Sequence, residues 1–216
     1  MNNVELLHQL GQISVCQIAD AVGSSLALDT QIRPLETSFR ICAPAFTVVC
    51  PPDDNLTLHH ALHLATPGQV LVVSGSGGGT AALWGELMSI SAQARGLSGT
   101  IIDGPARDPL EIAALKYPVF ARLIRPRRAS KERYGRIGGP IQFGDMTVNS
   151  GDIVVADCNG IVTFPSNVLA EVVEQARVVV RKEAEMKEVF RAGQTYFELA
   201  GLSSLVPSEQ HRTRGL

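Results

Sequence analysis

Several patterns are missing from this chain of 216 residues, and each absence excludes a class of protein. The first residues do not form a basic segment followed by an apolar run, so we expect no signal peptide. No apolar run approaches the roughly 18 residues that a membrane span needs, so we expect no membrane partner. The net charge of −2 gives no sign of nucleic-acid binding, although residues 122–136 form a local basic cluster. We therefore expect a cytoplasmic globular protein.

Cysteines and aromatic residues are also scarce. The four cysteines form no CxxC pair, and without a secretory segment we interpret them as reduced thiols: Cys16, Cys42, Cys50 and Cys158. Aromatic residues make up 5% of the chain and hydrophobic residues 45%, which predicts a core of valine, isoleucine, leucine and alanine. The length suits one domain over residues 1–216, with or without appended helices.

Hydrophobic periodicity and turn residues predict an α/β arrangement. Ser14 and Ser166 are the expected N-caps of two of its helices, and the sequence Asn159-Gly160 predicts a β-hairpin. The expected helices are residues 3–11, 14–23, 56–65, 85–95 and 167–192, and the expected strands are residues 32–34, 39–50, 69–74, 100–102, 119–124, 146–148, 153–156 and 161–164.

A glycine-rich segment follows the strand expected at residues 69–74. It is no P-loop, because no Gly-Lys-Ser/Thr sequence follows. Residues 77–82 do fit the G-x-G-x-x-A pattern of dinucleotide-binding proteins, with Asp103 about 20 residues further on. Short strands separated by glycine turns then replace a second strand–helix half. This argues against a nicotinamide-dependent oxidoreductase, which stays an alternative.

Three histidines lie on the helix expected at residues 56–65, and His59 and His63 share a helical face. The HExxH pattern of zinc enzymes is absent, because His60 occupies the glutamate position. We favour surface or interface histidines over a metal site.

The stretch from Trp84 to Glu111 contains the residues most suited to chemistry. Gly85 is expected to open a helix, on which Leu87 and Ile90 fall near the helical period. The sequence Asp103-Gly104-Pro105 predicts a sharp turn after the short strand at residues 100–102.

Arg107 and Asp108 stand side by side just beyond this strand. A helix N-terminus nearby has free N–H groups that attract anions. A fixed cation beside a fixed anion at the end of a strand suits a small carboxylate substrate held near a metal. The plainer interpretation is a surface ion pair, which contributes little.

Other polar residues have structural interpretations that compete with functional ones. Asp103 is interpreted as a turn-former. Glu111 is interpreted as a charge in the first turn of a helix, or as a supporting partner rather than a ligand. Asp157 and Asn159 are expected to shape a hairpin.

Three motifs resemble those of a known family. They are GELM at residues 85–88, DGPARDPLE at 103–111 and SGDIVVADCNGIVTFP at 150–165. In this order and spacing they resemble the family that joins 4-hydroxy-4-methyl-2-oxoglutarate and 4-carboxy-4-hydroxy-2-oxoadipate aldolases with the regulator of ribonuclease activity A. The resemblance covers about residues 10–195. It implies an α/β fold, a swivelling β/β/α domain with flanking N- and C-terminal helices, assembled as a homotrimer or homohexamer with active sites between subunits.

The resemblance also implies roles for single residues. Arg107 would bind the carboxylate of the substrate, and Asp108 would hold a divalent cation, Mg²⁺ or Mn²⁺, largely through water. The ribonuclease regulator lacks this aspartate, so Asp108 favours the enzyme over the alternative, a non-catalytic binding protein that regulates an RNA-processing ribonuclease. The substrate would also be held, partly by backbone N–H groups, by Gly85, Glu86, Leu87 and Met88.

These residues suit the cleavage of a 4-hydroxy-2-oxo acid to pyruvate and a second 2-oxo acid. The carboxylate and ketone oxygens of a 2-oxo acid can chelate a hard cation, and Arg107 can stabilise the enolate that cleavage leaves. Glu86 is the candidate base for the alcohol proton, unless a partner subunit supplies one. Oxaloacetate decarboxylation forms the same enolate and is the expected side activity. We expect no lysine at this site, which argues against a Schiff-base mechanism.

Overall fold

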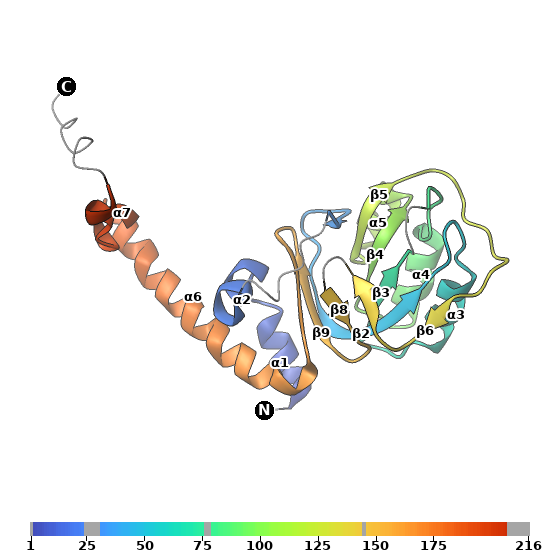
Figure 1. Ribbon diagram of the computed structural model, residues 1–216, viewed down its shortest axis with the longest axis horizontal. Helices are drawn as coiled ribbons and strands as arrows, with labels where there is room; N and C mark the ends of the chain where they lie inside the picture. The colour runs from blue at the N-terminus through green and yellow to red at the C-terminus, as the bar shows by residue number, and fades with distance from the viewer. Residues whose placement is uncertain (1, 24–30, 76–78, 144–145, 207–216) are drawn as a thin grey trace, which may run out of the picture.

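The structure is a computed structural model that describes residues 2–23, 31–75, 79–143 and 146–206. A body of sheet and helices is joined to a long helix that leads away from it (Figure 1). The polypeptide alternates strand and helix up to residue 124 and then continues mainly as short strands before this helix. The predicted α/β class, with flanking helices at both ends of the chain, is confirmed.

Four parallel strands form the centre of an eight-stranded sheet, and they pair in chain order. Helices α3 (Leu56–Leu64), α4 (Glu86–Ala94) and α5 (Pro109–Leu115) connect them. The strands are β2 (Ile41–Val49), β3 (Val70–Ser74), β4 (Gly99–Ala106) and β5 (Val119–Ile124). Because carboxyl ends of parallel strands meet at one edge, the segments after β3 and β4 lie together there.

Strand β2 joins this parallel unit to an antiparallel one. Its first residues, Ile41 to Pro44, pair with β9 (Ile153–Asp157), which forms a hairpin with β10 (Gly160–Phe164). The predicted turn at Asn159-Gly160 is therefore confirmed. Two short strands extend this sheet: β1 (Arg33–Pro34) pairs with β5, and β6 (Arg136–Ile137) pairs with β2. Strands β7 (Ile141–Phe143) and β8 (Met146–Val148) pair with each other in a separate sheet.

Helices from both ends of the chain cover the β9–β10 hairpin. Helices α1 (Asn3–Leu10) and α2 (Val15–Val22) pack beside α6 (Leu169–Arg191), which continues past them to α7 (Tyr196–Leu199) and a 3-10 helix at Leu202–Leu205 (Figure 1). Their shared core is separate from that of the parallel sheet and includes Leu10, Ile18, Val162, Phe164 and Val173. Within the described ranges, no helix combines the length and the apolar character that crossing a membrane requires.

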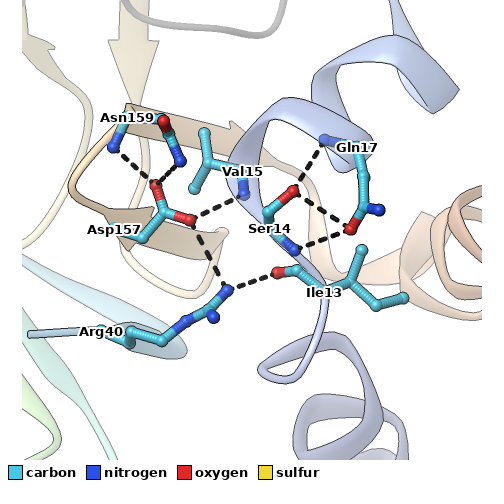
Figure 2. A network of polar contacts seen from close by, with 7 residues as sticks. All are labelled: Ile13, Ser14, Val15, Gln17, Arg40, Asp157 and Asn159. Carbon is cyan, nitrogen blue, oxygen red and sulfur yellow. Dashed lines mark hydrogen bonds and ion pairs between the residues drawn. The ribbon is translucent and has the colours of Figure 1, made fainter. Parts of the chain in front are cut away.

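Local capping explains where α2 begins. The Ser14 hydroxyl accepts from the N–H of Gln17 at 3.2 Å, and the Gln17 side chain accepts from the Ser14 N–H at 3.2 Å (Figure 2). Two backbone groups that a helix start leaves unpaired are thus satisfied. The predicted Ser14 cap is confirmed. The predicted Ser166 cap is wrong, because Ser166 begins a short 3-10 helix and α6 starts at Leu169 without a side-chain cap.

The predicted turn at residues 103–105 is also wrong. Strand β4 continues through Asp103, Gly104 and Pro105 to Ala106. The pairing register with β5 shifts between Ile102 and Pro105, so an irregularity within the strand accommodates the sequence that suggested a turn.

Helix α4 buries a different face from the one that periodicity suggested. Met88, Ser89 and Ala92 are buried, whereas Leu87 is 74% exposed and Ile90 is also exposed. The glycine-rich segment lies partly outside the described residues, at 76–78, and α4 starts only at Glu86. The segment therefore does not open a helix directly, as a dinucleotide-binding loop would.

Candidate active site

Two chain segments meet where β4 ends and α4 begins. Trp84 and Ala106 form an isolated parallel bridge, and the Arg107 N–H donates to the Trp84 carbonyl oxygen at 3.0 Å. These contacts bring Gly85 and Glu86 against Arg107 and Asp108. The structure therefore unites two motifs that lie about 20 residues apart in the chain.

Asp108 has an unusual backbone and one free oxygen. Its φ of 59° and ψ of 48° place it in the left-handed region, just before α5. Such a conformation is costly for a residue other than glycine, and it is enriched at functional sites. Its Oδ2 accepts from the Glu86 N–H at 3.1 Å and lies 3.4 Å from Arg107 Nε. Among the residues that the structure describes, none hydrogen-bonds to its Oδ1, and the side chain is 35% exposed.

Gly85 is required by space rather than by backbone conformation. Its φ of −163° is extended and open to any residue. A Cβ atom built on Gly85 would lie 2.6 Å from Asp108 Oδ2 and 3.0 Å from Arg107 Cγ. The absence of a side chain at residue 85 therefore allows the carboxylate to reach the start of α4.

A small cavity of about 130 Å³ adjoins this meeting point. The first turns of α3 and α4, the end of β4 and the segment after β5 surround it. The lining residues are Asn55, His59, Ala82, Leu83, Trp84, Gly85, Leu87, Met88, Arg107, Arg128 and Lys131.

Asn55 lines this cavity and has an unsatisfied hydrogen-bond acceptor. The residue is 6% exposed, and its Nδ2 donates to the Leu83 carbonyl oxygen at 2.9 Å. This bond fixes the orientation of the amide, because the reverse orientation would set two oxygens against each other. Its Oδ1 is buried and has no hydrogen-bond partner among the residues that the structure describes.

Asp54 fixes the segment that supplies Arg128 and Lys131. Its Oδ2 accepts from Ser130 Oγ at 2.5 Å and from the Glu132 N–H at 2.8 Å. Burial by itself would raise the pKa of Asp54, but these hydrogen bonds, with others to the carboxylate, outweigh it and hold the pKa well below its usual range. Asp54 therefore stays ionised and keeps two cationic side chains beside the cavity.

Positive charge dominates the polar lining. Burial, and then the charges of Lys131 and Arg128, lower the pKa of His59, so the imidazole is neutral at pH 7. The expectation of no lysine at the site is wrong, since Lys131 is present. Lys131 is exposed, however, and lacks the desolvated pocket that activates Schiff-base lysines.

Most of the predicted site residues meet here. Gly85, Leu87, Met88 and Arg107 line the cavity, and Asp108 lies against Gly85 and Arg107. Glu86 contributes its N–H to Asp108 but is not a lining residue.

Other candidates lie elsewhere. Asp103 pairs with Arg122 at 2.5 Å beside a different cavity, and Glu111 is exposed. In the described part of the chain, no group of three or more histidine, cysteine, aspartate or glutamate side chains could hold a metal.

The sequence interpretation missed several lining residues: Asn55, His59 as a cavity residue, Arg128 and Lys131. The first two are one turn apart at the start of α3. The only sequence signal for this pair was the group of three histidines on the same helix, which we interpreted as surface or interface residues.

Comparison with known proteins identifies the family. The family model described as RraA-like, Aldolase/RraA, matches residues 15–163. The chain belongs to the RraA-like family. This confirms the resemblance drawn from GELM, DGPARDPLE and the third motif.

Relatives of two kinds occur in this RraA-like family. A protein of Halalkalibacterium halodurans that carries the provisional name 4-hydroxy-4-methyl-2-oxoglutarate aldolase is 30% identical over 84% of this chain and 85% of its own. A crystal structure of an uncharacterised Pseudomonas syringae protein has a TM-score of 0.79 and 29% identity, covering 89% of this chain and 94% of that one. The structure of the RNA-processing inhibitor RraA from Thermus thermophilis has a TM-score of 0.64 and 25% identity, covering 70% of this chain and 92% of that one.

Proposed function

We propose that this chain is a divalent-metal-dependent carbon–carbon lyase that cleaves a 4-hydroxy-2-oxo acid, of the 4-hydroxy-4-methyl-2-oxoglutarate type, to pyruvate and a second 2-oxo acid. The observation that carries the proposal is the pair Arg107–Asp108: Arg107 lines the cavity, and Asp108 beside it has one carboxylate oxygen to which no described residue hydrogen-bonds. The aldolase name of the Halalkalibacterium halodurans relative supports the same class of reaction.

The residues at the site fit a hard cation such as Mg²⁺ or Mn²⁺. Oxygen ligands suit both ions; the side chain of Asp108 is partly exposed, and no described residue hydrogen-bonds to its Oδ1. No group of three or more histidine, cysteine, aspartate or glutamate side chains is described that could hold a metal. The remaining ligands would therefore be water and substrate. When bound, the cation would withdraw electrons from the 2-oxo group and favour enolate formation.

Arg107 and the start of α4 would bind the substrate. The planar guanidinium of Arg107 can hold a carboxylate through two hydrogen bonds. Beyond the Glu86 N–H, which donates to Asp108, the first turn of α4 has further N–H groups that attract an anion. Arg107 also lies where negative charge develops as the carbon–carbon bond breaks, and so stabilises the transition state. Decarboxylation of oxaloacetate requires the same stabilisation and is the side activity that we propose.

We further propose that a second copy of the chain completes the site, in a trimer or hexamer. Apolar side chains are exposed on the elements that surround Arg107 and Asp108. Leu87 is 74% and Leu110 80% exposed, and Ile90, Leu123 and Ile124 are exposed to smaller extents. A group of exposed apolar side chains at the rim of a site is typical of a subunit interface.

The alternative is a non-catalytic protein that binds and regulates an RNA-processing ribonuclease, as the name of the Thermus relative suggests for that protein. A binding protein has no need of an aspartate at residue 108 with one oxygen that no described residue contacts, and this favours the enzyme.

A coupled assay of pyruvate release tests the proposal. The purified chain is given 4-hydroxy-4-methyl-2-oxoglutarate or oxaloacetate, with Mg²⁺ and then with excess chelator. We expect pyruvate from both substrates with Mg²⁺ and a loss of release with chelator. No pyruvate from either substrate, together with tight binding of a ribonuclease, would establish the alternative.

A further inference from the structure

His59 lies near the start of α3 and lines the cavity with Arg107. Its N–H donates at 3.1 Å to the carbonyl oxygen of Asn55, which lies one helical turn earlier and also lines the cavity. The helix therefore fixes the position of His59 beside Arg107.

His59 is the titratable acceptor in this cavity. None of the described residues hydrogen-bonds to its ring, and its lowered pKa keeps it neutral at pH 7. The charged groups that line the cavity with it are Arg107 from the end of β4 and Arg128 and Lys131 from the segment after β5. No carboxylate is among the described lining residues. A neutral imidazole is thus the side chain of the cavity that can take a proton.

We infer that His59 takes the proton of the substrate's 4-hydroxyl group during cleavage. The inference rests on the proposed function and replaces Glu86 as the base.

The step balances without any co-reactant. The O–H bond of the 4-hydroxyl breaks and an N–H bond forms on His59, while the oxygen forms a double bond to C4. The C3–C4 bond breaks, and its electron pair remains on the C3 side as the enolate of pyruvate. The imidazolium then returns its proton to C3, which gives pyruvate and regenerates neutral His59. Oxaloacetate has no hydroxyl proton to lose, and its decarboxylation does not need this base.

The test compares the two reactions within one variant. In His59→Gln, with Mg²⁺ present, the ratio of kcat for cleavage of 4-hydroxy-4-methyl-2-oxoglutarate to kcat for oxaloacetate decarboxylation should fall by at least about 100-fold. His63→Gln is the matched control, because His63 is exposed on the last turn of the same helix and does not line the cavity. An equal loss of both reactions in His59→Gln, or an unchanged ratio, would overturn the inference.

Chemical rescue separates a base from a merely structural residue. Imidazole added to His59→Ala should restore cleavage of the hydroxy acid, with a rate that follows the neutral fraction of imidazole as pH is varied. In the unmodified protein, the lowered pKa of His59 should keep cleavage active at the ordinary pKa of histidine, and cleavage should decline only at more acidic pH, where His59 becomes protonated. Absence of rescue would count against the base.

The unmodified chain separates this inference from the proposed function. If it decarboxylates oxaloacetate but does not cleave the hydroxy acid, the role of His59 is wrong while the enolate site stands. If it acts on neither substrate, the proposed function fails, and the inference fails with it.

Discussion

Two aspartates of this protein make the same kinds of contact through one carboxylate oxygen, but they differ at the other oxygen. Asp157 Oδ2 accepts from the N–H of Val15, the first residue of α2, at 3.0 Å, and lies 3.5 Å from Arg40 (Figure 2). Asp108 Oδ2 accepts from the N–H of Glu86, the first residue of α4, and lies beside Arg107. Each carboxylate thus joins a helix start to an arginine.

The difference lies in the second oxygen. Asp157 Oδ1 accepts from both the N–H and the Nδ2 of Asn159, at 2.8 and 3.0 Å, and its side chain is 6% exposed. Asp108 Oδ1 has no such partner in the described structure, and that side chain is partly open to solvent. A saturated, buried carboxylate holds a fold together, whereas one with a spare oxygen at a cavity can bind a ligand. This contrast supports a structural role for Asp157 and the functional role that we propose for Asp108.

The largest effect should come from Asp108→Ala. It removes the proposed cation ligand, so Mg²⁺-dependent pyruvate release should fall by about 1000-fold. Denaturant unfolding should change by less than about 1 kcal/mol, because the ion pair that is lost lies near the surface. Full activity in this variant would contradict the role of Asp108.

Asp157→Ala should show the opposite pattern. It leaves the buried N–H of Val15 and the more exposed N–H of Asn159 without an acceptor, so the free energy of unfolding should fall by about 2–3 kcal/mol. Pyruvate release per folded molecule should stay the same, since neither Asp157 nor the residues that it contacts line the cavity. Urea unfolding gives the first quantity and the coupled assay the second. Lost activity in a folded Asp157→Ala protein would break the distinction between the two aspartates.

Gly85→Ala should disturb Asp108 without removing it. The added methyl group would lie 2.6 Å from Asp108 Oδ2, so the carboxylate must move, and pyruvate release should fall by about 10- to 100-fold. Gly104→Ala is the matched control, because its methyl group would meet no atom closer than 3.5 Å. Equal activities of the two variants in the same assay would show that the approach of Asp108 to α4 is unimportant.

The smallest effect should come from the cap of α2. Ser14→Ala removes the hydroxyl that accepts from the Gln17 N–H, and stability should fall by about 1 kcal/mol. Thr195→Ala removes an equivalent cap from α7, which buries no residue, and should change global unfolding less. A larger change from Thr195 than from Ser14, measured by urea unfolding, would contradict the packing described for the two helices.

The sequence predicted what depends on nearby residues. Ser14 and Gln17 are three positions apart, and Asn159-Gly160 is a two-residue signal, so both features could be inferred directly. The failure at Asp103-Gly104-Pro105 has a physical cause, because a turn-forming sequence was kept extended by pairing with β5, which lies elsewhere in the chain.

The site was predicted only where motifs marked it. Arg107 and Asp108 were identified by their order and by the family resemblance. The contribution of Asn55 and His59 depends on a cavity that four distant segments form together. The exposure of Leu87 and Ile90 was also missed, since periodicity identifies an apolar face but not what covers it.

Binding of Mn²⁺, followed by electron paramagnetic resonance as the ion is titrated into the protein, tests the central claim most directly. The account predicts that the unmodified chain and Asp157→Ala bind the ion equally, and that Asp108→Ala does not bind it. Equal binding by all three proteins would contradict the claim that the free oxygen of Asp108 is the ligand.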